Sequence, residues 1–286
     1  MNLTDRIYVA VHLALTVLVC ARFRARAHWS WYLAWNALAI AAILVLSRHQ
    51  RKGPWWEFAH DWLPVLLFTG VFEEVSFLSL ALRDTWQNPT LLGWESALFP
   101  FPPGEWLRCH SAPWFGELLE AGYFTFYPLY PAVAGVLWGW RKRSHFAGAF
   151  RRLTDALSVG YSVCYATYLI FPTRSPSDNM AVDSAAAPAA AAGPFHFLVR
   201  LIQSHAGVHG NAFPSSHIML AFVVLVVALR YLPRLAPWLL LCIVLMCTGA
   251  VYDGYHYAVD VLAGGLLGAL VGGLFVRTGR RAVSKK

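Results

Sequence analysis

The fold of this chain is decided by residues 204–265, which contain Pro214-Ser215-Ser216-His217 and, further on, His256-Tyr257-Ala258-Val259-Asp260. Between these two motifs lie the apolar runs 218–231 and 238–251, separated by a short break that holds two prolines. The runs are long enough for one membrane helix down and one back. We therefore expect the two motif histidines to lie at the same face of a membrane.

The composition is that of a membrane protein. Of the 286 residues, 58% are hydrophobic and 13% are charged, and the mean hydropathy is +0.48. These values indicate a polytopic membrane protein rather than a soluble domain. The net charge of +8 does not indicate nucleic-acid binding, because the basic residues stand in short runs between apolar segments, where they determine membrane topology.

The cysteines and the N-terminus add two expectations. Of the five cysteines, only Cys109 lies in a polar connection, so we predict neither a disulfide framework nor a CxxC metal site. Arg6 precedes an apolar run over residues 7–20, which resembles a signal sequence, but Arg22 follows at once and no convincing cleavage site is present. We therefore expect an uncleaved membrane anchor.

Hydrophobic segments recur along the whole chain and predict an all-α polytopic membrane protein of about eight transmembrane helices. The eight predicted spans are 7–22, 29–47, 62–82, 114–140, 154–172, 217–232, 237–252 and 256–276. We expect an N-terminal transmembrane hairpin with a basic cytoplasmic loop over residues 1–61, a six-helix core over residues 62–276, and a basic cytoplasmic tail over residues 277–286.

Basic residues in the connections predict the orientation. With both termini inside, most of the 23 Lys and Arg residues lie on the cytoplasmic side, whereas the basic residues at 22–26 are an exception on the outer side. In this orientation the polar stretches 83–113, 173–216 and 252–256 share the outer face. An outer site and short cytoplasmic connections are typical of a bacterial inner membrane with chemistry on the periplasmic side.

Three other segments invite interpretation. Glu73 and Glu74 fall within a predicted span, where carboxylates are either functional or paired with neighbouring helices. The aromatic and Pro-rich segment 84–113 is expected along the membrane surface, where it can line a lipid entrance. The connection 173–216 is long and Ala-rich in its middle, which favours a cover rather than a domain, with a short amphipathic helix over residues 195–202.

The two motifs carry residues suited to phosphate chemistry. In the first, Pro214 and the two serines are typical of a helix start, whose free N–H groups suit a phosphate, and His217 is placed to donate a proton. In the second, His256 and Asp260 are four positions apart, so a helix places the carboxylate beside the imidazole. A capping role for the first motif and a buried hydrogen bond for the second are the structural alternatives.

These residues resemble the signature of the type 2 phosphatidic-acid phosphatase superfamily. Two of its three motifs are present, as residues 214–217 and 256–260. The family's first motif pairs a Lys with an Arg-Pro, whereas here Thr167 stands at the Lys position and Arg174 is followed by Ser175. The family's third motif has an Arg where this chain has Ala250. With these departures, the chain is more similar to the inositol phosphorylceramide synthase-like branch of the superfamily.

The resemblance implies a phosphatase-like catalytic core over residues 62–276 and a mechanism for it. His256 attacks the phosphorus of a lipid phosphate or phosphodiester, Asp260 orients it, and His217 protonates the departing oxygen. The phosphohistidine then passes its phosphoryl group to water or to an alcohol or lipid acceptor. The same three residues serve a phosphatase and a transferase, so the motifs do not separate the two.

The negative charge of the phosphate must still be stabilised by other groups. The residues expected to bind it are Arg174, Ser215 and Ser216, with Arg200 and His209 as weaker candidates. Because two cations of the family are missing, the charge count favours a phosphodiester or head-group donor over a dianionic monoester. A membrane lipid is the expected partner, no cofactor, metal or nucleic acid is expected, and the oligomeric state is not predicted.

Three rival interpretations remain open. His205 and His209, with the two motif histidines, can be imagined as a metal site. Glu73 and Glu74 with the His256–Asp260 pair can be imagined as the proton relay of a transporter, although no inverted repeat is present. The two missing cations also allow a non-enzymatic lipid-binding protein.

Overall fold

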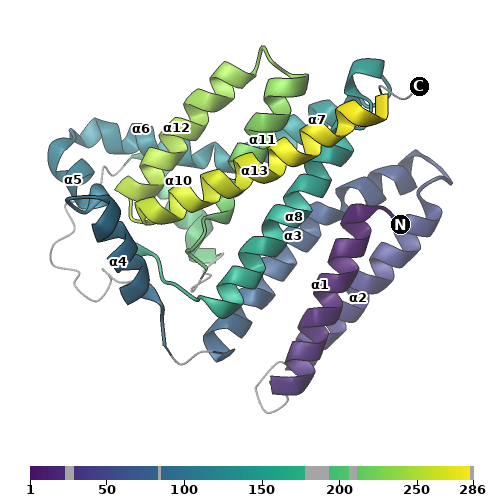
Figure 1. The fold of residues 1–286 in the computed structure, drawn as a ribbon, viewed down its shortest axis with the longest axis horizontal. Coiled ribbons are helices and arrows are strands. Elements are labelled where there is room, and N and C mark those ends of the chain that lie inside the picture. Colours follow the sequence, from purple (N-terminus) through teal and green to yellow (C-terminus); the bar gives the residue numbers. More distant parts are fainter. Residues whose placement is uncertain (23–28, 83–84, 178–192, 206–210, 284–286) are drawn as a thin grey trace.

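A computed structural model describes residues 1–22, 29–82, 85–177, 193–205 and 211–283. In these ranges the chain forms helices and no β-strand (Figure 1). The helices are α1 (Leu3–Arg22), α2 (Trp29–His49), α3 (Pro54–Leu82), α4 (Asn88–Leu98), α5 (Pro103–His110), α6 (Pro113–Phe124), α7 (Phe126–Gly139), the 3-10 helix η1 (Ser144–Phe146), α8 (Ala149–Ile170), α10 (Pro194–His205), α11 (Ser216–Tyr231), α12 (Ala236–Tyr252) and α13 (Ala258–Val283).

The predicted all-α membrane fold is confirmed. Among the described residues, α1, α2, α3 and α13 are long and apolar enough to cross a membrane, and α11 and α12 are shorter apolar helices. Helices also lie at the remaining predicted spans, but the number of eight membrane crossings is not confirmed. The division into an N-terminal hairpin, a core and a tail stays a prediction.

The predicted span 114–140 is interrupted at Thr125, between α6 and α7. Pro128 lacks the N–H group that would bond to the Phe124 carbonyl and continue the helical ladder across this point. The Thr125 hydroxyl instead donates to the Gly122 carbonyl at 2.6 Å. The break lets α6 pack along α12 while α7 packs against α11.

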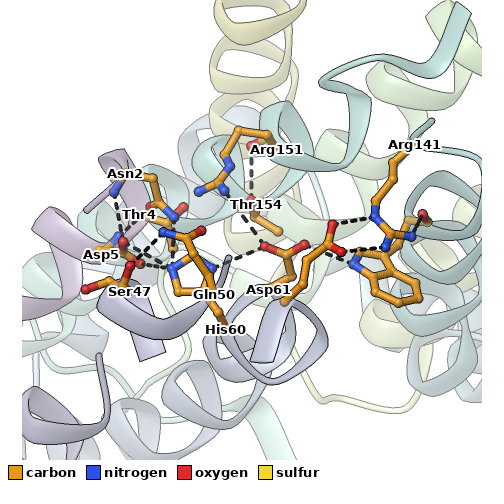
Figure 2. Close-up of polar contacts among 12 residues, drawn as sticks. Asn2, Thr4, Asp5, Ser47, Gln50, His60, Asp61, Arg141, Arg151 and Thr154 are labelled. Atoms are coloured by element: carbon orange, nitrogen blue, oxygen red, sulfur yellow. Dashed lines mark hydrogen bonds and ion pairs between the residues drawn. The ribbon is translucent and has the colours of Figure 1, made fainter. Parts of the chain in front are cut away.

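The N-terminal hairpin is tied to the rest of the chain by a polar network at one end of the molecule (Figure 2). The buried imidazole of His60 lies 3.1 Å from Asp5 of α1 and 3.3 Å from Asp61 beside it on α3. Asp61 also accepts a hydrogen bond from Trp138 of α7 at 2.9 Å and lies 3.8 Å from Arg151 of α8. Polar groups from four helices, three of which contribute charged or titratable side chains, thereby meet where α1 and α8 begin.

The carboxylate pair in α3 has two different environments. Glu74 is buried and accepts a hydrogen bond from the Asn36 amide of α2 at 2.7 Å, and the Asn36 oxygen contacts the buried His12 of α1. Glu73 is exposed. This arrangement agrees with the interpretation in which the span carboxylate faces a neighbouring helix.

Close packing of α13 on α11 positions the segment that contains the first motif. A Cβ atom at Gly264 would collide with the carbonyl oxygen of Ser215, and one at Gly268 would collide with that of Met219. Only glycine allows the two backbones to approach this closely. The crossing lies at the start of both helices, near α4 and α5 and far from the two chain termini (Figure 1).

This crossing leads to a first prediction. We expect Gly264→Ala to destabilise the protein by about 1–3 kcal/mol, because the added methyl group forces the helices apart. Gly273→Ala is the matched control, since nothing lies within 4 Å of its Cβ position in the same helix. The control should be neutral or stabilising by up to about 1 kcal/mol through helix propensity. Thermal unfolding in detergent measures both, and equal stability of the two variants would contradict the prediction.

Candidate active site

The loop before α11 is held by the end of α8. Asn211 and Thr173 form an isolated parallel bridge, and the Phe213 N–H donates to the Thr173 hydroxyl oxygen at 2.9 Å. The buried Tyr168 hydroxyl donates to the Pro214 carbonyl at 2.8 Å. These contacts fix the approach of residues 211–215 to the first turn of α11.

Ser215 connects the two motifs. Its hydroxyl oxygen caps α11 by accepting a hydrogen bond from the Ile218 N–H at 3.4 Å, and the same atom lies 3.0 Å from His256 Nε2. Its backbone N–H donates to the Asp260 carbonyl at 3.1 Å. The serine that begins α11 therefore contacts both predicted functional residues of the second motif.

His256 lies in the turn between α12 and α13 and is 6% exposed. Its backbone N–H donates to the Ala250 carbonyl at 2.9 Å. Its Nδ1 lies 3.5 Å from Asp260 Oδ2, which is longer than a normal hydrogen bond. Asp260 Oδ2 accepts a hydrogen bond from the Tyr257 N–H at 2.8 Å. The carboxylate is thus held beside the imidazole by the first turn of α13.

His217 lies across from His256 in an aromatic surround. The centroids of the two imidazole rings are 6.0 Å apart, and the His217 ring packs edge-on at 4.3 Å from Phe126. Its Nδ1 is buried and has no hydrogen-bond partner within the described part of the chain. The structure therefore brings His217, His256 and Asp260 together with Ser215, whereas their roles in catalysis stay predictions.

The predicted cation Arg174 contacts Trp86 and Asn88. Its guanidinium stacks 4.3 Å from the ring centroid of Trp86, and its backbone pairs with the Asn88 amide through two hydrogen bonds of 2.9 Å. Thr167, at the position of the family's Lys, donates its hydroxyl to the Val163 carbonyl of its own helix at 2.9 Å. Ser216 is buried beside Ser215 at the start of α11.

Two other charged residues approach His256, and neither was predicted. Glu95 of α4 is buried, and its two oxygens accept hydrogen bonds from the Ala258 and Val259 N–H groups at 3.1 and 2.9 Å. Arg108 of α5 donates to the Tyr252 carbonyl at 2.6 Å, and both side chains line a cavity that reaches His256. The only signal was composition, because Arg108 is the only Lys or Arg between Trp86 and Pro113 in the sequence.

The alternative metal site of His205, His209 and the two motif histidines lies only partly within the described residues. His209 lies outside the described residues. Within those residues, no group of three or more His, Cys, Asp or Glu side chains is arranged to hold a metal ion.

Comparison with known proteins identifies the family. The model of the PAP2 superfamily matches residues 89–274, which cover α4 to α13 and both motifs. The chain belongs to the PAP2 superfamily. No curated protein and no solved structure matched it. Members of the PAP2 superfamily are phosphatases and phosphotransferases, so membership supports a phosphatase-type function on lipid phosphates. The N-terminal helices α1 to α3 precede the matched region.

The burial of His256 predicts a pH dependence. Burial lowers the pKa of His256 from 6.5 to about 4, although a hydrogen bond with the backbone of Ala212 raises it. A neutral imidazole is the nucleophilic form, so it is available at any pH above this value. On the acid side of the profile, we expect kcat/KM for a phosphodiester lipid, which does not titrate in this range, to fall only below about pH 4. An acid limb of the wild-type pH profile with its midpoint near 6.5 would contradict this expectation.

Proposed function

We propose that this PAP2 protein is an integral-membrane lipid phosphatase or phosphotransferase that acts through a phosphohistidine intermediate. The observation that carries the proposal is the meeting of both motifs around Ser215, with His256 Nε2 3.0 Å from its hydroxyl and the His217 ring 6.0 Å from the His256 ring. A nucleophile and an acid whose rings lie this close together suit in-line displacement at phosphorus.

In the first step, the lone pair on His256 Nε2 attacks phosphorus while the bond from phosphorus to the leaving oxygen breaks. The proton on His256 Nδ1 faces the Asp260 carboxylate, which stabilises the positive charge that develops on the ring. His217 donates its proton to the departing oxygen and becomes neutral. The lone pair engaged by the Ser215 hydroxyl is the one that attacks, so Ser215 aims the ring before substrate arrives.

In the second step, neutral His217 accepts a proton from water or from an acceptor alcohol. The resulting oxygen nucleophile attacks the phosphohistidine, the N–P bond breaks, and His256 returns to its neutral form. Water gives hydrolysis, and an alcohol gives a new phosphate ester. The replacement of the family's cations by Thr167 and Ala250 supports the inositol phosphorylceramide synthase-like branch, in which transfer takes place.

The charge pattern of the connections supports a site on the outer membrane face. The basic residues of the 141–152 connection and of the C-terminal end lie at the ends of α7, α8 and α13 away from the site. Because Lys and Arg accumulate on the cytoplasmic side, the site end then faces outward. We propose a multi-pass protein of a bacterial inner membrane whose site faces the periplasm, and a catalytic unit over residues 62–276.

Product analysis tests the proposed reaction. Purified protein in detergent is incubated with labelled lipid phosphates and phospholipids, with and without alcohols or lipid acceptors. Release of inorganic phosphate or of a phosphorylated head group indicates hydrolysis, whereas a new phosphodiester indicates transfer. Absence of any product with every lipid would contradict the proposal and favour a non-enzymatic lipid-binding protein.

Substitutions of the two histidines separate their roles. We expect His256→Ala to abolish turnover, because no nucleophile remains to form the intermediate. His217→Ala should lower turnover by about 10²–10⁴-fold, as loss of a general acid does, and the loss should shrink with a substrate that has a good leaving group. His49→Ala is the matched control, since that histidine lies at the far end of α2. Full activity of His256→Ala on every lipid would refute the mechanism.

A further inference from the structure

The cavity beside His256 contains groups that recognise a head group. It has a volume of about 580 Å³ and is formed by α4, α5, the turn between them and the residues around His256. Its charged side chains are Glu95, Glu105 and Arg108, and its aromatic side chains are Phe99, Phe101 and Tyr257. Both signs of charge and several aromatic rings therefore share one space next to the proposed nucleophile.

The anion-binding capacity of this space is small. Glu95 already occupies the two N–H groups at the start of α13, so they are not free to bind phosphate oxygens. Ala250 and Thr167 replace the cations of the family signature. Among the described residues that line the cavity, Arg108 is the only Lys or Arg. One cation can balance the single charge of a phosphodiester, but it leaves the second charge of a monoester uncompensated next to carboxylates.

The charge of Arg108 remains available for an anion. Its Nη1 donates to the Tyr252 carbonyl, a neutral acceptor. The neighbouring Asp253 does not neutralise it, because burial and the charge of Glu120 raise the pKa of Asp253 to about 8. At neutral pH Asp253 is therefore mostly protonated, and Arg108 can attract the phosphodiester.

Glu105 and the aromatic rings are the groups in the cavity that can attract a cation. Glu105 is exposed on the same helix as Arg108, one turn before it, and lines the cavity. Phe101, also in the lining, is stacked on Trp106 with ring centroids 5.4 Å apart, which fixes the direction of its face. A carboxylate and aromatic faces together are the groups that bind an ammonium cation.

We propose that this site selects phosphodiester lipids whose head group carries a cationic ammonium, with Arg108 binding the phosphate and Glu105 and the aromatic rings binding the ammonium. The inference rests on the proposed function, because it names the substrate class of the same site. It differs from a preference for dianionic monoesters and from a preference for uncharged polyol head groups, including the inositol after which the proposed branch is named. Aromatic rings and carboxylates also suit sugar hydroxyls, so a polyol lipid is the rival that the experiment must exclude.

The experiment compares kcat/KM for three head-group classes in mixed micelles of constant detergent and lipid content. Phosphatidylcholine and phosphatidylethanolamine carry an ammonium, phosphatidylglycerol and phosphatidylinositol carry a polyol, and phosphatidic acid is a monoester. We expect the ammonium lipids to be the preferred substrates. A preference for polyol lipids or for phosphatidic acid overturns the inference but leaves the proposed function intact. Lack of turnover of every lipid overturns both.

The variant Glu105→Gln separates charge from hydrogen bonding. Glutamine keeps the capacity to bind hydroxyl groups but loses the attraction for ammonium, so kcat/KM for the ammonium lipids should fall roughly twofold to fivefold, as an exposed charge contact does. The value for polyol lipids should not change. Glu57→Gln is the control, because it removes the same charge at the far end, where Glu57 pairs with Arg141. An equal effect of Glu105→Gln on both lipid classes would refute the role of its charge.

Discussion

The contact that organises this molecule is the one between Ser215 and the start of α13. The Ser215 N–H binds the Asp260 carbonyl, its hydroxyl contacts His256, and its carbonyl packs directly on Gly264. Two groups of this one serine thus meet the second motif, and a third meets the helix that follows it. Because these contacts span two helices with a long hairpin between them, neither motif is positioned without the other.

Glu95 holds the same helix start from the other side, and this has a consequence for chemistry. A buried carboxylate on two free N–H groups stabilises the first turn of α13 through both hydrogen bonds and the helix dipole. The same bonds occupy a place where a phosphate would otherwise bind. The bonds that position Asp260 therefore reduce the capacity of this helix start to bind an anion, and Arg108 is the Lys or Arg that lines the cavity in the described part of the chain.

The sequence predicts the helices well where apolar runs are long. It is a poor guide to residues whose positions depend on contacts between distant parts of the chain. The membrane helices and the meeting of residues 214–217 with residues 256–260 follow from run lengths, because a hairpin of two spans returns to one face. Arg174 was chosen by elimination; its backbone bonds to Asn88 and its guanidinium stacks on Trp86, and its role in phosphate binding stays a prediction. Glu95 was missed because its partners lie some 160 residues further on and are backbone groups, which leave no side-chain pattern to recognise.

The burial of His256 both helps and opposes its proposed role. A neutral imidazole needs no deprotonation to attack, which favours the nucleophile, but the same low-dielectric surround penalises the positive charge that develops on the ring. Asp260 is the group that can offset this penalty, and it now lies 3.5 Å from Nδ1, beyond normal hydrogen-bond length. Catalytic hydrogen bonds often tighten only in the transition-state complex. The interaction between Asp260 and His256 can therefore strengthen as positive charge develops on the imidazole ring. An interaction that is stronger in the transition state than in the ground state accelerates the reaction instead of only binding the substrate.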